Sequence, residues 1–274
     1  MQGNQMDSQA NQDPVGTRTS SFLNSLTRLF SGEKNDGATR RFIRLFADHG
    51  VRFEQIPQLL PQLTPEALSS QGTLRAALTP QILSQTASLF GVRRAWLDGT
   101  DNVMYTRHTC YKEPQAFFKN LSEFRTGSNS GFCVRALSAT LDLDRKKDVR
   151  QDLALVLVKT LTRLGDTDVY SYAVCGDAWD WSYAPGRLQL KAMARLVAMT
   201  GQPIPLIKTP LREIEKVREG LVVPQHATAS NLIAHPFLDD YAQSAEESNY
   251  ARETEELEFV VNYIQTKGLS AQYA

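Results

Sequence analysis

The chain has 274 residues, with 30 lysines and arginines against 30 aspartates and glutamates, and 42% of its residues are hydrophobic. This composition predicts one or two hydrophobic cores and argues against nonspecific coating of nucleic acid, which requires a basic footprint. No apolar run approaches about 18 residues and no apolar segment follows the amino terminus, so neither a membrane span nor a signal peptide is predicted. The sequence therefore favours a cytoplasmic protein.

Residues 1–37 are rich in Gln, Asn, Ser, Thr, Gly and Asp, a composition typical of a disordered tail. Within this tail, residues 21–31 carry apolar side chains at helical spacing and predict a short amphipathic helix. The helix would dock either on the protein's own surface or on a partner or membrane. Its apolar positions are Phe22, Leu23, Leu26, Leu29 and Phe30.

The segment after the tail predicts a series of about five short helices. The first spans 39–49 and the second spans 53–60. Two copies of a helix-start pattern follow at Thr64 and Thr79, where threonine caps the helix and the next residue, proline, occupies its first position. A glycine is expected to end the second of these helices, and residues 92–99 predict one more short helix.

The following segment, residues 105–236, predicts a small mixed α/β domain of the α+β class. Strand-like runs at 132–143, 152–162 and 168–175 predict an antiparallel sheet, with a hairpin at 165–166. The middle run is apolar on both faces, which favours a central strand. The remaining predicted elements are a helix, a strand and a helix at 187–200, 204–208 and 210–219.

Residues 237–274 are predicted to be an acidic helical tail. Eight acidic residues and a single arginine lie between Phe237 and Thr266. A helical stripe of Leu257, Val260, Val261 and Ile264 runs through the same segment. The tail would either dock on a partner or cover the basic face of residues 38–104.

The end of the predicted helices, Leu89-Phe-Gly-Val-Arg-Arg-Ala-Trp-Leu-Asp-Gly99, resembles the closing phrase of the lambda-repressor-like (XRE) helix-turn-helix regulators. The resemblance covers roughly residues 38–104, about a quarter of the chain. It implies a five-helix DNA-binding domain in a bacterial transcriptional regulator, with a recognition helix that starts near Thr64. It also implies a homodimer on double-stranded DNA, with 105–236 as a sensing or dimerisation domain.

A local excess of basic residues supports a DNA-binding surface, because residues 38–112 hold nine basic and five acidic side chains. Arginines of the first helix would hold phosphates, and polar residues of the expected recognition helix would approach base edges. The predicted contact residues are Arg40, Arg41, Arg44, Thr64, Ser69, Ser70, Gln71 and Arg75.

Two features depart from the family pattern. Glu66 would repel phosphate within the expected recognition helix, where no arginine is placed to grip guanine, and Pro57 interrupts the expected second helix. These departures favour an alternative, a protein-interaction or adaptor module whose helix-turn-helix scaffold no longer binds DNA. In that case the arginines are the solvated faces of amphipathic helices.

A dense group of aromatic and charged residues around 184–186 is predicted to line a pocket for a small-molecule effector. The same residues would equally suit a dimer interface or a second core. The predicted pocket residues are Tyr172, Asp177, Trp179, Trp181, Tyr183 and Arg187.

Neither a phosphate-binding loop nor a catalytic constellation occurs in the sequence, so no enzyme activity, cofactor or metal is predicted. His108 and Cys110 would be half of a metal site with Cys133 or Cys175, but buried structural cysteines are the default. Three cysteines at unequal spacing also indicate free thiols rather than a disulfide framework.

Overall fold

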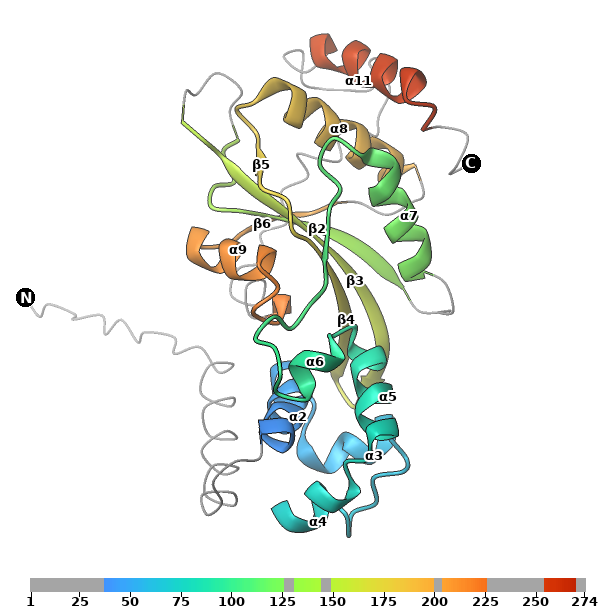
Figure 1. The fold of residues 1–274 in the computed structure, drawn as a ribbon. Coiled ribbons are helices and arrows are strands. Elements are labelled where there is room, and N and C mark those ends of the chain that lie inside the picture. Colours follow the sequence, from blue (N-terminus) through green and yellow to red (C-terminus); the bar gives the residue numbers. More distant parts are fainter. Residues whose placement is uncertain (1–36, 126–130, 144–148, 200–203, 226–253, 270–274) are drawn as a thin grey trace, which may run out of the picture.

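The structure is a computed structural model that describes residues 37–125, 131–143, 149–199, 204–225 and 254–269 (Figure 1). Its described part is a mixed α/β structure in which helices cover both faces of a mixed sheet. The helix predicted at 21–31 and the acidic segment 237–253 lie outside the described residues.

Residues 37–104, which we call the helical region, begin with α2. Its Phe42, Leu45 and Phe46 are fully buried, because apolar residues three and four apart share one face of a helix. Pro57 is the second residue of the short helix α3 and does not interrupt it, since a proline in the first turn loses no helical hydrogen bond. The elements are α2 (Gly37–Asp48), η1 (Phe53–Gln55), α3 (Ile56–Leu59), α4 (Gln71–Ala77), α5 (Pro80–Phe90) and α6 (Arg94–Leu97).

The limits of α5 follow from its local sequence, as predicted. The Thr79 side chain accepts a hydrogen bond from the Ile82 amide at 3.3 Å, and Pro80 is the first helical residue. Gly91 ends the helix with a φ of 71°. A Cβ there would also lie 2.8 Å from the Tyr172 carbonyl oxygen, so the position excludes a side chain on two grounds.

The prediction of a helix that starts near Thr64 is wrong. Residues 65–68 form an isolated turn, and the next helix, α4, begins at Gln71. Ser70 and Thr73 cap α4 reciprocally: the Ser70 hydroxyl accepts from the Thr73 amide at 3.2 Å, and the Thr73 hydroxyl accepts from the Ser70 amide at 3.1 Å. The Thr64 hydroxyl makes a long 3.4 Å contact to the Ala67 amide and also a hydrogen bond to the Glu66 carboxylate. The stronger cap therefore sets the start of the helix.

The sheet has the strand order β1-β4-β3-β2-β6, and β5 pairs with the start of β3. The β2–β3 and β3–β4 pairs are antiparallel, whereas β1–β4 and β2–β6 are parallel. The antiparallel prediction is thus wrong at both edges, where strands distant along the chain meet through long connections. The strands are β1 (Arg107–His108), β2 (Phe132–Ser138), β3 (Asp152–Leu164), β4 (Thr167–Cys175), β5 (Trp179–Asp180) and β6 (Leu206–Lys208).

The central strand β3 separates two hydrophobic cores, as its apolar alternation predicts. Ala154, Val156 and Val158 belong to a core shared with the helical region and with α9 (Leu211–Arg218). The leucines at 153, 155 and 157 belong to a second core with α7 (Pro114–Arg125) and α8 (Ala184–Ala198). The helical region therefore packs against the same face of the sheet as α9 and shares one core with it.

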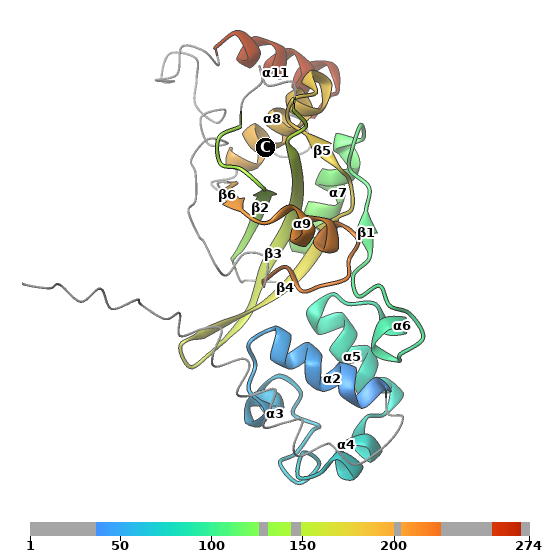
Figure 2. The ribbon, with the colours of Figure 1, turned by 90° about the vertical axis from the view of Figure 1, so that its left-hand side faces the viewer.

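The helix α8 lies between the sheet and the C-terminal helix α11 (Thr254–Thr266) (Figures 1 and 2). Leu257, Val260 and Ile264 of α11 are buried, so the predicted apolar stripe covers the chain's own α8. In both views α11 lies at the opposite end of the molecule from α4. The described part of the tail, α11, therefore does not cover the basic face of residues 38–104, and the acidic segment 237–253 lies outside the described residues.

Candidate nucleic-acid interface

The helix α4 lies at the end of the helical region that is farthest from the sheet (Figures 1 and 2). Leu74 anchors it and is fully buried, whereas Gly72, Thr73, Arg75 and Ala76 are exposed. Three of these four side chains are short or absent, so another surface can approach the backbone of α4 closely. Such a helix is suited to enter a groove.

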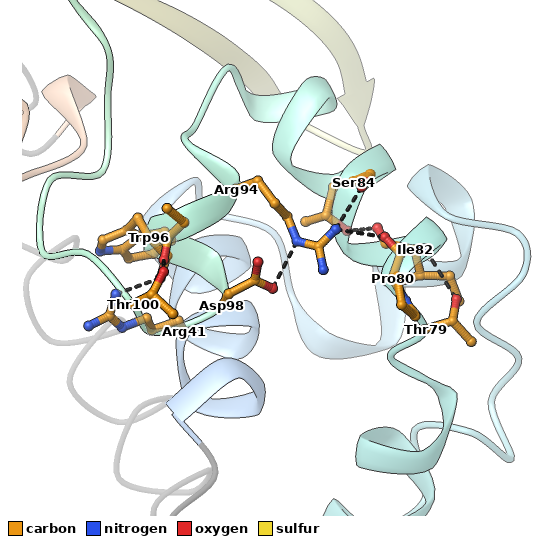
Figure 3. Close-up of polar contacts among 11 residues, drawn as sticks. Arg41, Thr79, Pro80, Ile82, Ser84, Arg94, Trp96, Asp98 and Thr100 are labelled. Carbon is orange, nitrogen blue, oxygen red and sulfur yellow. Dashed lines mark hydrogen bonds and ion pairs between the residues drawn. The ribbon is translucent and has the colours of Figure 1, made fainter.

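Arg41, one of the predicted phosphate contacts, has a structural role. Its guanidinium donates to the carbonyl oxygens of Trp96 and Asp101 and lies 5.5 Å from the centre of the Trp96 ring (Figure 3). This side chain ties α2 to α6 and to the loop after it. Arg40 is exposed on α2, and Arg44 is exposed but lies 3.1 Å from the Asp48 carboxylate.

Other arginines of the helical region are also engaged within it. Arg94 donates to the Pro80 carbonyl at 2.8 Å, to the Ser84 hydroxyl at 2.7 Å and to Asp98 at 2.8 Å (Figure 3). Two further ion pairs join Arg93 to Asp101 at 2.6 Å and Arg52 to Glu54 at 3.2 Å. With seven arginines and five acidic residues in 37–104, the basic surface is small.

The predicted base-contact residues are brought together only in part. Ser69, Ser70 and Gln71 lie at the start of α4, and Arg75 lies one turn further along it. The Ser70 hydroxyl is used by the cap, and the Ser69 hydroxyl donates to the Glu66 carbonyl at 2.7 Å. Sequence reasoning missed the exposed face of α4, Gly72, Thr73 and Ala76, although the Ser-x-x-Thr capping pattern marks where that helix begins.

Thr64 lies directly before the turn at 65–68, not in a helix. A hydrogen bond from its side chain lowers the pKa of the Glu66 carboxyl, which is fully exposed. Glu66 is therefore ionised at neutral pH, and this charge disfavours phosphate near the turn.

An uncharged groove of about 570 Å³ lies between the end of α3 and the outer side of α5. One acceptor at this groove, the Gln85 Oε1 atom, is buried and has no hydrogen-bond partner among the described residues. The lining residues are Leu59, Leu60, Pro61, Gln62, Ser84, Gln85, Ser88 and Leu89. Because no charged side chain lines it, the groove does not attract phosphate.

The aromatic residues of the predicted effector pocket do not form one pocket. Tyr172 points into the core beside the helical region, where its ring lies 5.8 Å from His49, while Trp179 and Trp181 are buried in the core on the other face. The Tyr183 side chain is exposed. Positions close along the chain were separated because a sheet divides its residues between two faces. Trp179 and Trp181 are instead part of a second core, which was the alternative interpretation of this group.

The two charged members of that predicted pocket have separate structural partners. Asp177 accepts hydrogen bonds from the backbone amides of Cys110 and Tyr111, the latter at 2.9 Å. Arg187 is buried and grips Glu256 of α11 with two nitrogens, at 2.8 and 3.1 Å.

Arg187 belongs to a buried ionic cluster that sequence reasoning missed. The Lys191 ammonium also contacts Glu256 and lies 5.2 Å from the centre of the Trp181 ring. Burial raises the pKa of the Glu256 carboxyl, but hydrogen bonds from Arg187 and Lys191 and their charges outweigh burial and hold the pKa at about 2. Nothing in local spacing pairs residues so far apart in the chain.

Cys110 and Cys175 are buried side by side, with their sulfur atoms 3.5 Å apart, whereas Cys133 lies in β2. Within the part of the chain that the structure describes, no three His, Cys, Asp or Glu side chains are grouped to hold a metal ion. In the same part, no helix has the length and apolar character needed to cross a membrane. Comparison with protein-family models, curated proteins and solved structures found no match to this chain.

Proposed function

We propose that residues 37–104 are a helix-turn-helix DNA-binding domain of a transcriptional regulator, and that α4 is the helix that enters the major groove. The observation that carries the proposal is the outward face of α4. It combines short exposed side chains with one arginine, Arg75, at the free end of the helical region. Arginine reads guanine through two hydrogen bonds, and short side chains let the helix approach the bases.

The proposed phosphate contacts are Arg40 and Arg44 on α2. Both are exposed, and the pair that Arg44 makes with Asp48 is a surface pair that a phosphate can replace at little cost. A helix of seven residues buries little surface, so specific binding requires two copies of the chain on two half-sites. The regulator would therefore act as a homodimer, with the sheet domain after residue 105 as its dimerisation or sensing part.

A protein-interaction module is the second candidate. It is favoured by the uncharged groove between α3 and α5 and by the ion pairs that engage Arg52, Arg93 and Arg94 within the helical region. A groove of this kind suits an apolar peptide better than nucleic acid.

Selection of bound fragments from random DNA by the full-length chain, across a salt series, tests the first candidate. The expected result is a palindromic motif whose log affinity falls with log salt. Arg75→Ala should weaken binding to that motif about 10-fold or more and relax the preference at one base pair.

Gln81→Ala, an exposed change on the neighbouring helix α5, is the matched control and should leave the motif unchanged. If no motif is enriched at low salt, or if Arg75→Ala binds the motif like the wild type, α4 does not read DNA. The protein-interaction candidate then stands alone.

A further inference from the structure

Two cysteine thiols meet close to the point where the chain leaves the helical region and joins the sheet. Cys110 follows β1 by two residues and Cys175 ends β4, and their Sγ atoms lie 3.5 Å apart in the core that contains α7 and α8. The two residues are 0% and 1% exposed. A covalent bond between two sulfur atoms is about 2.05 Å long, so an approach of roughly 1.5 Å would convert this contact into a disulfide.

The turn that carries Cys110 is held in place by hydrogen bonds from two sides. The Asp177 carboxylate accepts from the Cys110 amide. On α8, Gln189 donates to the Cys110 carbonyl at 2.9 Å and accepts from the Lys112 amide at 2.8 Å. Lys112 has a φ of 66°, a left-handed conformation that a residue other than glycine keeps only where its surroundings fix it. The position of Cys110 opposite Cys175 is therefore set by the fold.

The two sulfur atoms differ in their electrostatic surroundings. The Asn120 side chain of α7 donates to the Cys110 Sγ atom at 3.9 Å. Hydrogen bonds from Cys175 and Asn120 lower the pKa of the Cys110 thiol, against the effects of burial and of the Asp177 charge. The hydrogen bond to Cys110 and burial raise the pKa of the Cys175 thiol. Cys110 is therefore the member of the pair that ionises first and acts as the nucleophile.

Cys110 is also the member that a small molecule reaches more readily. Its neighbours Thr109, Lys112 and Glu113 are exposed, so a small opening of this surface turn uncovers the thiol. Cys175 instead lies in β4, which pairs with β1 on one side and with β3 on the other.

We propose that Cys110 and Cys175 are an oxidation site at which a peroxide produces a reversible disulfide. The Cys110 thiolate attacks one peroxide oxygen, the O–O bond breaks, and the released hydroxide takes up the proton that the Cys110 thiol gave up. The Cys175 sulfur then attacks the sulfenic acid on Cys110, the S–O bond breaks, and the oxygen leaves as water with the Cys175 proton. Two thiols lose two electrons and two protons, and one hydrogen peroxide becomes two waters.

The disulfide would fasten the connection between the helical region and the sheet. The two-residue strand β1 lies on the connection from α6 to α7, and the Gly176 amide donates to the His108 carbonyl at 3.0 Å beside the cysteine pair. A covalent bond two residues after β1 would hold this connection on β4. The proposal does not depend on whether α4 binds DNA.

Treatment of the full-length chain with hydrogen peroxide tests the proposal. The remaining thiols are blocked with N-ethylmaleimide, and the peptides are mapped by mass spectrometry. Cys133 is the internal reference, because it is a half-buried thiol that packs against the core on the other face of the sheet. The expected product joins the peptides of Cys110 and Cys175, lacks two hydrogens, carries alkylated Cys133 and returns to thiols with dithiothreitol. The pair should be lost at least about 10-fold faster than the Cys133 thiol.

Two variants and a second measurement sharpen the test. Cys133→Ser should form the disulfide as the wild type does, whereas Cys175→Ala should leave a sulfenic acid on Cys110 that dimedone traps. In the oxidised wild type, amides of residues 105–113 should exchange with solvent several-fold more slowly than in the reduced chain, with those of α4 unchanged.

Three results would overturn the proposal. In the first, Cys133 reacts while Cys110 and Cys175 remain thiols. In the second, Cys110 and Cys175 are oxidised separately to sulfinic acids without a bond between them. In the third, the disulfide that forms contains Cys133.

Discussion

The two ends of the molecule use charge in different ways. In the helical region, ion pairs such as Arg44–Asp48 and Arg94–Asp98 join residues four apart on one helix or at its end, and they are partly or largely exposed. At the other end, Arg187 and Lys191 are buried with Glu256, which lies 69 and 65 positions further along the chain.

This difference has an energetic consequence. Exposed local pairs contribute about 0–1 kcal/mol each, since water and salt screen them. A buried carboxylate between two cations contributes more, because removing it takes an ionic partner away from both cations in a place that water reaches poorly. Charge at the first end therefore contributes little to the free energy of unfolding, whereas charge at the second end helps to hold α11 on α8.

The largest expected effect comes from Glu256→Ala. Removing one member of a buried ion pair costs about 3–5 kcal/mol, and the loss here should be about 2–3 kcal/mol because α11 can move away and let water reach the cations. The matched change Asp98→Ala should cost less than about 0.5 kcal/mol, since Arg94 keeps its bonds to Pro80 and Ser84. Urea unfolding measures the free energy of unfolding of both variants. Similar losses in the two variants would contradict the proposed difference between the buried and the exposed pairs.

Acid should weaken the same contact. The pKa of Glu256 lies at about 2, below its ordinary value of 4.5. The ionic contribution is therefore fully present above pH 4.5 and is lost as the pH falls towards 2. The difference in unfolding free energy between the wild type and Glu256→Gln should shrink over this range, because other carboxylates affect both chains alike. A difference that stays constant down to pH 2 would mean that the charge of Glu256 is not what holds α11.

A smaller effect should distinguish the two possible helix starts in the helical region. Ser70→Ala should cost about 1 kcal/mol, because the Ser70 hydroxyl caps α4. Thr64→Ala, where the contact to Ala67 is long, should cost only a few tenths of this. Thermal unfolding of the two variants compares these losses of stability. A larger loss for Thr64→Ala would indicate that the helix begins near Thr64, as the sequence pattern suggests.

Local sequence signals predicted helix boundaries correctly where no second capping residue lay nearby. Thr79, Pro80 and Gly91 delimit α5 as expected, and the two apolar faces of β3 identified it as a central strand. The same threonine–proline pattern failed at Thr64 because Ser70 and Thr73, a few residues later, form the better cap. Identical local signals thus had different outcomes where a stronger neighbour was present.

The candidate sites were harder to predict, because they depend on which face of the sheet a residue occupies. Tyr172 and Trp179 are seven positions apart, yet they lie in cores on opposite sides of the sheet. The role of Arg41 was also hidden, since its carbonyl partners are Trp96 in α6 and Asp101 in the loop after it, 55 and 60 residues later.

By itself the sequence determined most of the helices, the limits of α5 and the apolar alternation of the central strand, because hydrogen bonds and side-chain periodicity act between near neighbours. Only the tertiary structure decided which strands pair in parallel, that the tryptophans are core residues and that Glu256 meets Arg187 and Lys191. Such contacts join distant segments, and burial determines their strength. Burial depends on how the layers of the fold pack together, so it cannot be predicted from any short segment of the chain.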